Sequence, residues 1–231
     1  MAPVFRDARF GIERLAARGH VPRHRHRRAY AAIVLAGGYQ EAGDAGRWHV
    51  SPGDVLVHAG LEAHQDRVGA AGCTLINVEL ADDDLAGGLF RLADPDVIVR
   101  LAEYDGAAAL SCLRDQARTS VTPLDDWPDL LARRLRDDET FSIGRWASDT
   151  GLAAESVSRG FRRAYGLSPR RYRLEARGRR ALAMIQGGRA GLAAIAQECG
   201  FADQPHLTRT ISEISGRPPG QWRRAEVNSV Q

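Results

Sequence analysis

The sequence has no lysine, only three cysteines and no long hydrophobic run. All 32 basic side chains among its 231 residues are arginine, so every cationic contact must come from a planar guanidinium group. The cysteines form no CxxC pair, which excludes a zinc-finger motif or a disulfide framework and fits a reducing compartment. The longest uncharged apolar run, Ala29–Tyr39, is too short to span a bilayer, and the N-terminus lacks a signal-peptide pattern. We expect a soluble, cytoplasmic protein with no membrane partner.

The composition is that of a globular protein, but its charge is unevenly distributed. Hydrophobic residues make up 44% and charged residues 26%, which excludes a disordered or collagen-like chain. Residues 1–141 hold 17 arginines and 22 acidic residues, a net charge of −5. Residues 142–231 hold 15 arginines and 7 acidic residues, a net charge of +8. This asymmetry predicts two functions, with any polyanionic partner at the C-terminal end.

The first 80 residues favour strands, and the pattern then becomes helical. Short β-rich runs with glycine-containing turns predict a barrel or sandwich. The clearest runs are Ala31–Leu35, Arg47–Val50, Val55–His58 and Thr74–Leu80. From Asp82 onwards the apolar residues follow helical spacing, with a proline-containing break before Trp127. They include Leu85, Leu89, Leu92, Val97, Leu101, Tyr104, Leu110, Leu113 and Ala117, and after the break Leu130, Leu131 and Leu135.

These patterns predict an α+β fold with two domains. We expect a sensor or effector domain at residues 1–81 and an all-α domain at residues 133–231. Residues 82–132 would form a helical linker that could also support a homodimer.

The last ninety residues contain an approximate duplication. Each copy has a helix, a turn with glycine and a second helix, which is the helix-turn-helix plan. Gly151 and Gly200 permit the tight turns, with positive φ expected at both. Val157 and Phe161 in the first copy, and Leu207 and Ile211 in the second, point inward at i, i+4 spacing. The opposite faces, free to enter a DNA major groove, carry Glu155, Ser158, Arg159, Arg162 and Arg163, and then Gln204, His206, Thr208 and Arg209.

Residues 133 to about 225 resemble the DNA-binding domain of the AraC/XylS family of transcriptional regulators. The resemblance rests on Ile195-Ala196, on Cys199-Gly200-Phe201-Ala202-Asp203-Gln204, and on His206, Arg209 and Gly216-x-Pro218-Pro219. It implies seven helices, with Pro169–Gln186 as a linker helix of about 27 Å between two helix-turn-helix units. Two recognition helices could then enter successive major grooves, roughly 34–36 Å apart.

The same resemblance assigns roles on the DNA. It places base contacts on Glu155, Ser158, Arg159, Gln204, His206 and Arg209, and phosphate contacts on Arg162, Arg163, Thr208 and Arg170. Each of these side chains could instead belong to a solvated helix face. Ala153 stands where the first recognition helix usually has a serine cap, and a lost cap costs about 1 kcal/mol. Gly178 interrupts the linker helix, where glycine costs about 1 kcal/mol relative to alanine.

A weaker histidine pattern lies in the N-terminal half. His24-x-His26 precedes Tyr30, and Pro52-Gly53-Asp54 precedes His64. The pattern resembles the cupin barrel, in which a glutamate would be expected at the position of Tyr30. On an unbroken strand, residues 24, 26 and 30 would share one face. His24, His26 and His64 could then form a three-imidazole site for Zn, Ni or Fe. His58 and Tyr30 could line the same cavity. Alternatively, the histidines hydrogen-bond an organic effector, or form a polar core without a ligand.

These observations together predict a sequence-specific DNA-binding transcription regulator. The family resemblance implies an effector-responsive activator that binds promoter DNA and contacts RNA polymerase, with no catalytic residues. The alternative is a metal-dependent cupin enzyme, of the dioxygenase or isomerase type, with an accessory DNA-binding domain. The missing glutamate and the duplicated helix-turn-helix pattern, which catalysis does not need, argue against the enzyme.

Overall fold

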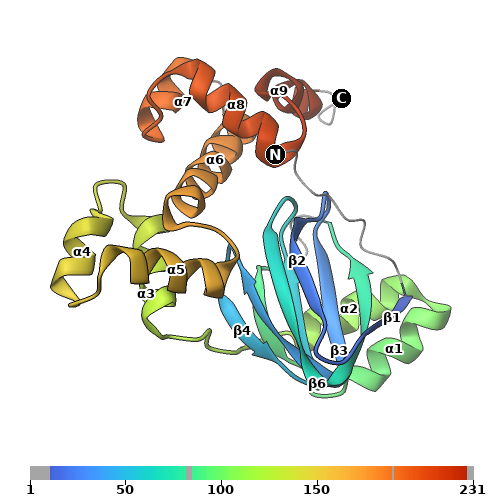
Figure 1. Cartoon of the computed structure of the whole chain (residues 1–231). Coiled ribbons are helices and arrows are strands. Elements are labelled where there is room, and N and C mark those ends of the chain that lie inside the picture. The colour runs from blue at the N-terminus through green and yellow to red at the C-terminus, as the bar shows by residue number, and fades with distance from the viewer. Residues whose placement is uncertain (1–10, 82–84, 189, 228–231) are drawn as a thin grey trace. The chain divides into compact units, whose positions relative to one another are not determined.

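The computed structural model describes residues 11–81, 85–188 and 190–227, and it forms two compact units divided after Asp125 (Figure 1). The first unit consists of antiparallel strands with two helices, and the described part of the second is helical. The predicted α+β architecture with two domains is therefore confirmed. Within the described ranges, no helix is both long and apolar enough to cross a membrane.

Two long strands organise the N-terminal sheet. β3 (Tyr30–Gly43) and β6 (Ala63–Glu79) pair antiparallel along most of their length. β6 also pairs with β1 and β2, β3 also pairs with β4 and β5, and β7 and β8 continue the sheet beyond β5. The shorter strands are β1 (Gly11–Leu15), β2 (His20–Arg25), β4 (Arg47–Val50), β5 (Asp54–His58), β7 (Gly88–Arg91) and β8 (Thr119–Ser120).

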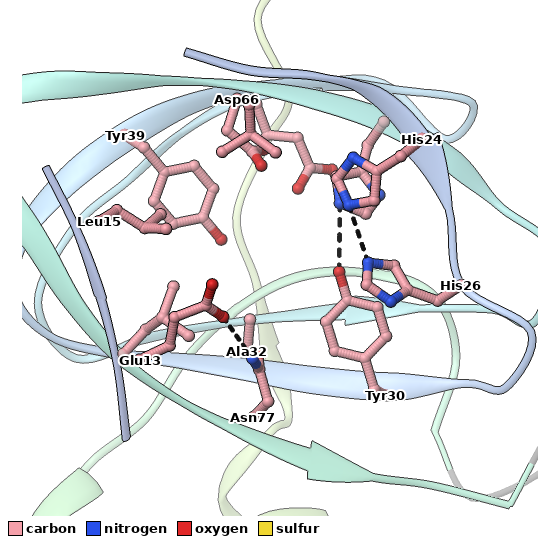
Figure 2. A pocket seen from close by; sticks show the side chains of 13 residues that line it. Glu13, Leu15, His24, His26, Tyr30, Ala32, Tyr39, Asp66 and Asn77 are labelled. Carbon is pink, nitrogen blue, oxygen red and sulfur yellow. Dashed lines mark hydrogen bonds between the residues drawn. The ribbon is translucent and has the colours of Figure 1, made fainter. Parts of the chain in front are cut away.

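One face of this sheet encloses a pocket. Successive side chains of a strand point to opposite faces, so Ala32 and Asn77 line the pocket while their neighbours Ala31 and Ile76 pack on the other side. Figure 2 shows the residues around this pocket. Beside it lies a buried cluster made of Val34, Tyr39, Trp48, Val50, Leu56, Val68, Cys73, Leu75 and Leu89.

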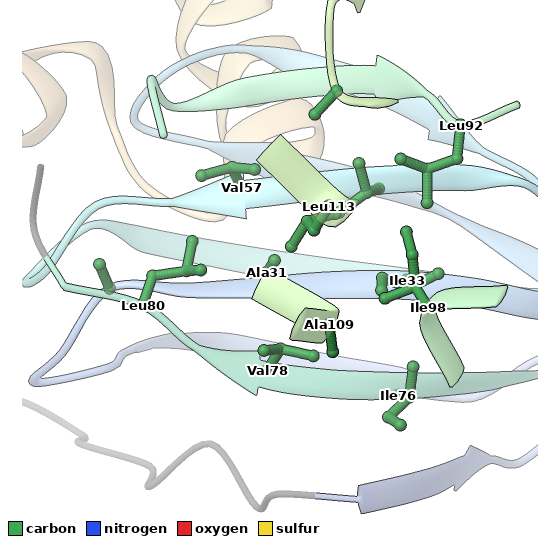
Figure 3. Close-up of a cluster of buried hydrophobic side chains, with 13 residues drawn as sticks. Ala31, Ile33, Val57, Ile76, Val78, Leu80, Leu92, Ile98, Ala109 and Leu113 are labelled. Carbon is green, nitrogen blue, oxygen red and sulfur yellow. The ribbon is translucent and has the colours of Figure 1, made fainter. Parts of the chain in front are cut away.

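The other face of the sheet is covered by two helices, α1 (Pro95–Tyr104) and α2 (Gly106–Gln116). Figure 3 shows Ile98, Ala109 and Leu113 from these helices against the aliphatic side chains of the strands. Leu113 is fully buried and Ile98 is 1% exposed. The helices therefore complete the core of the N-terminal unit.

This packing corrects the predicted domain boundaries. We expected the sensor domain to end at residue 81 and residues 82–132 to form a separate helical linker. Instead β7 pairs with β5, α1 and α2 pack on the sheet, and the N-terminal unit extends to Asp125. The helical spacing of Leu85, Leu89 and Leu92 was misleading, because Leu89 lies in β7. Residues 82–84 lie outside the described residues.

The strand predictions were correct but incomplete. The prediction for Arg47–Val50 matches β4. The other three runs lie within longer strands: Ala31–Leu35 within β3, Val55–His58 within β5, and Thr74–Leu80, apart from Leu80, within β6. The unbroken strand expected through residues 24 to 30 is wrong. β2 ends at Arg25 and β3 begins at Tyr30, so His26 lies in the connection between them.

The second unit contains seven helices among its described residues, as the family resemblance implied. They are α3 (Trp127–Asp137), α4 (Ile143–Asp149), α5 (Ala154–Tyr165), α6 (Pro169–Gly187), α7 (Leu192–Glu198), α8 (Gln204–Ser215) and α9 (Pro219–Val227). In Figure 1, α6 runs from the end of the unit that holds α3, α4 and α5 to the end that holds α7, α8 and α9. At about 1.5 Å per residue its 19 residues span about 28 Å.

Three aromatic rings pack together in the first half of this unit. Phe161 and Tyr165 of α5 stack with ring centroids 4.7 Å apart, and Tyr172 of α6 meets Phe161 edge-on at 5.4 Å. The Tyr165 hydroxyl donates to the buried carboxylate of Asp129 on α3, at 2.7 Å. Arg136, also on α3, donates to the Tyr172 hydroxyl at 3.0 Å. These bonds satisfy the polar ends of the rings, so α3 belongs to the C-terminal unit.

Candidate functional site

The two helix-turn-helix units share the same backbone hydrogen bonds. In the first, the amide of Leu152 donates to the carbonyl of Ala147 at 2.9 Å, and in the second Phe201 donates to Ala196 at 2.8 Å. The turn glycines that precede these donors have φ of +67° and +69°, as predicted. An alanine would be strained there, because L-residues rarely adopt positive φ. The sequence duplication is therefore a structural duplication, α4–α5 and α7–α8.

The N-termini of the two recognition helices differ. At α8, the Asp203 side chain accepts a hydrogen bond from the His206 amide at 2.6 Å. At α5, Ala153 occupies the cap position and provides no side-chain hydrogen bond. The predicted loss of a cap in the first unit is confirmed, so one more amide of the first turn of α5 must be satisfied by water or a ligand.

The outward face of α5 carries the predicted contact residues. Val157, Phe161 and Tyr165 are buried, as the i, i+4 pattern required. The opposite face is polar and basic: Glu155, Arg159, Arg162 and Arg163 are exposed and Ser158 is half-buried. Spacings of four and three residues place Glu155, Arg159 and Arg162 along one side of the helix.

Fewer of the predicted contact residues are exposed on α8 than on α5. Leu207 and Ile211 are buried, whereas Gln204 and Arg209 are exposed. His206 and Thr208 are half-buried, and the His206 ring meets the Phe201 ring edge-on at 5.2 Å. Gln204 and Arg209 are therefore the most accessible of the predicted contacts on α8.

Several arginines of the basic domain have partners within the domain. Arg171 joins α6 to α8 through Glu213 at 2.8 Å, and also pairs with Glu175 at 2.9 Å. Other arginine side chains of the domain donate to backbone carbonyls: Arg173 to Phe141, Arg177 to Gly200, Arg180 to Glu198 and Arg223 to Ala190. The net charge of +8 therefore overstates the charge directed at a polyanion.

Gly178 has a packing role that the sequence did not reveal. A Cβ atom at this position would lie 2.8 Å from Cδ1 of Ile214 and 3.0 Å from Cγ2 of Thr210. The missing side chain therefore allows α6 and α8 to approach closely. We expected glycine to cost about 1 kcal/mol relative to alanine at this position. That expectation is corrected, because the methyl group of an alanine would disturb the contact between α6 and α8.

In the N-terminal unit, the predicted histidines converge in the pocket. Nε2 of His24 lies 3.0 Å from Nε2 of His26, and the Tyr30 hydroxyl lies 3.3 Å from Nε2 of His64 (Figure 2). His24, His26 and His64 are all less than a tenth exposed. One ligand atom from each lies within 4.8 Å of the others, so the three could hold one metal ion. His58 stacks on Tyr30 at 4.6 Å, beside the pocket residues.

A second group of possible metal ligands was missed. Glu41, His58 and His64 also bring one ligand atom each within 4.8 Å, and Oε2 of Glu41 lies 3.3 Å from Nε2 of His58. The sequence analysis did not consider Glu41, whose odd number would place it on the opposite face from Tyr30 in a regular strand. The pairing of β3 with β6 shifts between Val34 and Ala36 and again between Gly37 and Tyr39. Such bulges change which face a residue occupies, and they leave no clear mark in the sequence.

Burial moves the protonation of these groups toward their neutral forms. Desolvation lowers the pKa of His64 well below its usual value, and the neighbouring imidazoles lower it further. Desolvation also lowers the pKa of His58, raises that of Glu41 well above its usual range, and raises that of Tyr30. The lowered pKa values of His58 and His64 favour their neutral imidazoles at neutral pH, which is the form that binds metals.

The pocket extends beyond the histidines. Its volume is about 470 Å³, within the range of small-molecule sites. Figure 2 shows Glu13, Leu15 and Tyr39 on the side away from His26. Asn77 donates to Glu13 at 3.0 Å. The residues lining the pocket are Glu13, Leu15, Val21, His24, His26, Tyr30, Ala32, Tyr39, Glu41, His64, Asp66, Leu75 and Asn77.

Comparison with family models gives a match within the C-terminal unit. Residues 146–225 match the family described as "Helix-turn-helix domain". No curated protein matches the chain. Fatty acid-bound ToxT from Vibrio cholerae strain SCE256 aligns with 92% of this chain and 93% of its own, at 10% identity and a TM-score of 0.42.

Two further solved structures each align with less than half of this chain. The C-terminal domain of AraT, a response regulator from Geobacillus stearothermophilus, covers 45% of this chain and 88% of its own, at 16% identity and a TM-score of 0.41. A probable AraC family regulator from Rhodopseudomonas palustris CGA009 covers 43% and 92%, at 19% identity and a TM-score of 0.38. The family match and the duplicated turn geometry show that the C-terminal unit contains an AraC-type helix-turn-helix domain, and they support a DNA-binding transcription regulator.

Proposed function

We propose that this regulator reads two successive major-groove segments of promoter DNA and that a ligand in the N-terminal pocket controls its activity. The observation that supports the first part is the duplication of one turn geometry at the two ends of α6. A helix of about 28 Å that holds two recognition helices suits two grooves one helical turn apart. Base contacts are proposed for Glu155, Ser158, Arg159, Gln204, His206 and Arg209.

The remaining predicted contacts would hold the DNA backbone. Arg162, Arg163, Arg170 and Thr208 are proposed to contact phosphates, which position a protein without specifying sequence. Arg159 and Arg209 can each bond a guanine with two hydrogen bonds, and Gln204 can bond an adenine in the same way.

Selection of binding sites from a random DNA library tests this proposal. Selected fragments should contain two short preferred segments about one helical turn apart. The full chain should bind them at least about 10³-fold more tightly than scrambled DNA at the same salt concentration. No enrichment, or equal affinity for scrambled DNA, would reject sequence-specific recognition.

We further propose that the pocket binds a metal ion through His24, His26 and His64. The donor set supports this, since three imidazoles suit Zn, Ni or Fe. His64 is 3% exposed, and its Nδ1 has no hydrogen-bond partner among the described residues. A bound metal would supply a Lewis acid that orients an effector, while Tyr30 and His58 border the site.

We also propose that the protein is a transcriptional activator and that it forms a homodimer. An activator would contact RNA polymerase and raise transcription in a reconstituted assay, whereas a repressor would lower it. A homodimer would show twice the chain mass in sedimentation at micromolar concentration. Turnover of a small-molecule substrate by the metal-loaded protein would instead favour the enzyme alternative.

A further inference from the structure

Three arginines lie along one side of α6. They are Arg173, Arg177 and Arg180, and spacings of four and three residues bring their side chains to the same side of a helix. The base and phosphate contacts proposed above do not include them. Each of the three donates a hydrogen bond to a backbone carbonyl of another segment, which indicates a role within the domain.

Two of these arginines bond the turn of the second helix-turn-helix unit. Arg180 donates to the carbonyl of Glu198, the last residue of α7, at 3.0 Å. The last carbonyls of a helix have no partner within the helix, so the guanidinium satisfies one of them. Arg177 donates to the carbonyl of Gly200 at 2.9 Å, and a Cβ atom at Gly200 would lie 3.2 Å from Cζ of Arg177. The turn glycine therefore also leaves room for this guanidinium.

The same arginines contact the connection between α3 and α4, which leads into the first unit. Arg173 donates to the carbonyl of Phe141 at 2.5 Å, and its Cζ atom lies 5.7 Å from the centroid of the Phe141 ring. Arg180 forms an ion pair with the side chain of Glu139. Arg177 makes a longer contact of 3.4 Å with the carbonyl of Glu139. Arg177 and Arg180 therefore each join the segment before the first unit to the turn of the second.

We propose that Arg177 and Arg180 are positioning residues that hold the two helix-turn-helix units in one relative orientation. The length of α6 sets the distance between the units, whereas a side chain that bonds segments of both also restricts their rotation. A planar guanidinium with five N–H donors can bond two acceptors at once, while the ammonium group of lysine is a compact point charge. This inference rests on the proposed reading of two DNA segments, because both recognition helices must face the same side of the DNA.

Affinities of Arg177 variants for three DNA fragments at constant salt test the proposal. One fragment carries both segments selected from the random library, the second carries one segment with the other scrambled, and the third is fully scrambled. Arg177→Met removes the donors, and Arg177→Lys keeps the positive charge. Both variants should bind the two-segment fragment about tenfold more weakly relative to the one-segment fragment, because a looser connection lowers the effective concentration of the second unit. A simple loss of charge would lower both affinities alike.

The spacing between the segments provides a second readout. Inserting half a helical turn should weaken binding of the wild-type chain, and this penalty should be smaller in both Arg177 variants. Arg134→Met, which removes an exposed arginine of α3, is the charge-matched control for Arg177→Met and should change neither readout. Circular dichroism confirms folding, and Arg180→Lys keeps the test valid if the Arg177 variants unfold.

The possible outcomes separate this inference from the proposed function. A wild-type ratio of affinities with a wild-type spacing penalty in the Arg177 variants would overturn the assignment. Equal losses on the one-segment and two-segment fragments would also overturn it, since they would indicate a direct DNA contact or a general loss of stability. If the wild-type chain itself gains nothing from the second segment, the proposed function fails and the inference fails with it. A chain that needs both segments, with variants that behave identically, would retain the proposed function and lose only this inference.

Discussion

At the scale of single residues, every basic side chain is an arginine, so residue type does not distinguish a structural arginine from one that contacts DNA. Only the location of the arginine in the fold does so. Arg171 and Arg177 bond groups of their own domain, whereas Arg159 and Arg209 lie exposed on the recognition helices. A guanidinium can bond a guanine with two hydrogen bonds or a phosphate without sequence preference. Only comparison of different DNA sequences separates these two roles.

Arg209→Ala should weaken binding to the preferred site by about 1–3 kcal/mol and relax specificity at one position. The expected cause is the loss of a two-bond contact with a base in the groove entered by α8. Fluorescence anisotropy on preferred and scrambled DNA measures both effects. Arg100→Ala, which removes an exposed arginine of α1, is the control and should change neither affinity. An equal loss on scrambled DNA would make Arg209 a phosphate contact.

His64→Ala should abolish metal binding, because His64 belongs to both groups of potential ligands. Elemental analysis of the purified protein measures metal per chain. His24→Ala and Glu41→Gln distinguish the groups, since the first removes a ligand from the three-histidine set and the second from the Glu41 set. Affinity for scrambled DNA should stay unchanged in all three variants. Stoichiometric metal in His64→Ala would contradict both ligand sets.

At the scale of elements, the two helix-turn-helix units share a turn but differ in their helix caps. Asp203 caps α8, whereas Ala153 leaves α5 without a side-chain cap. The sequence revealed this difference because caps depend on one residue at a fixed position. We therefore expect the first unit to contribute less to DNA binding than the second.

Ala153→Ser should stabilise the first turn of α5 by up to about 1 kcal/mol, and Asp203→Ala should destabilise α8 by a similar amount. Hydrogen exchange of the amides in each first turn measures these changes locally. The opposite signs in two equivalent positions provide the internal control. Unchanged exchange in Asp203→Ala would show that its side chain contributes no cap energy.

Close packing between helices also depends on glycine. A Cβ atom at Gly160 of α5 would lie 2.4 Å from the Trp127 ring of α3, whereas Gly144 of α4 has nothing within 4 Å. Gly160→Ala should therefore lower the free energy of unfolding of the domain by about 1–3 kcal/mol. Gly144→Ala is the matched control and should be neutral or stabilising by up to about 1 kcal/mol. Urea unfolding measures both variants, and equal effects would contradict the packing argument.

At the scale of the whole molecule, local patterns predicted the helical unit far better than the sheet. Caps, turn glycines and the i, i+4 spacing of Val157 and Phe161 are local, so the sequence displays them. Glu41 reaches the pocket because β3 contains bulges, and Leu89 lies in β7 because a distant strand pairs with it. Such long-range pairing overrides local spacing, which explains both errors.

The central claim is that two recognition helices held by α6 read two DNA segments one helical turn apart. The most direct test inserts about half a helical turn between the two segments of the selected site and measures affinity at constant salt. The account predicts that specific binding falls toward the affinity for scrambled DNA and recovers in part when a full turn is inserted and the segments face the same side again. Affinity that does not depend on the spacing would contradict it.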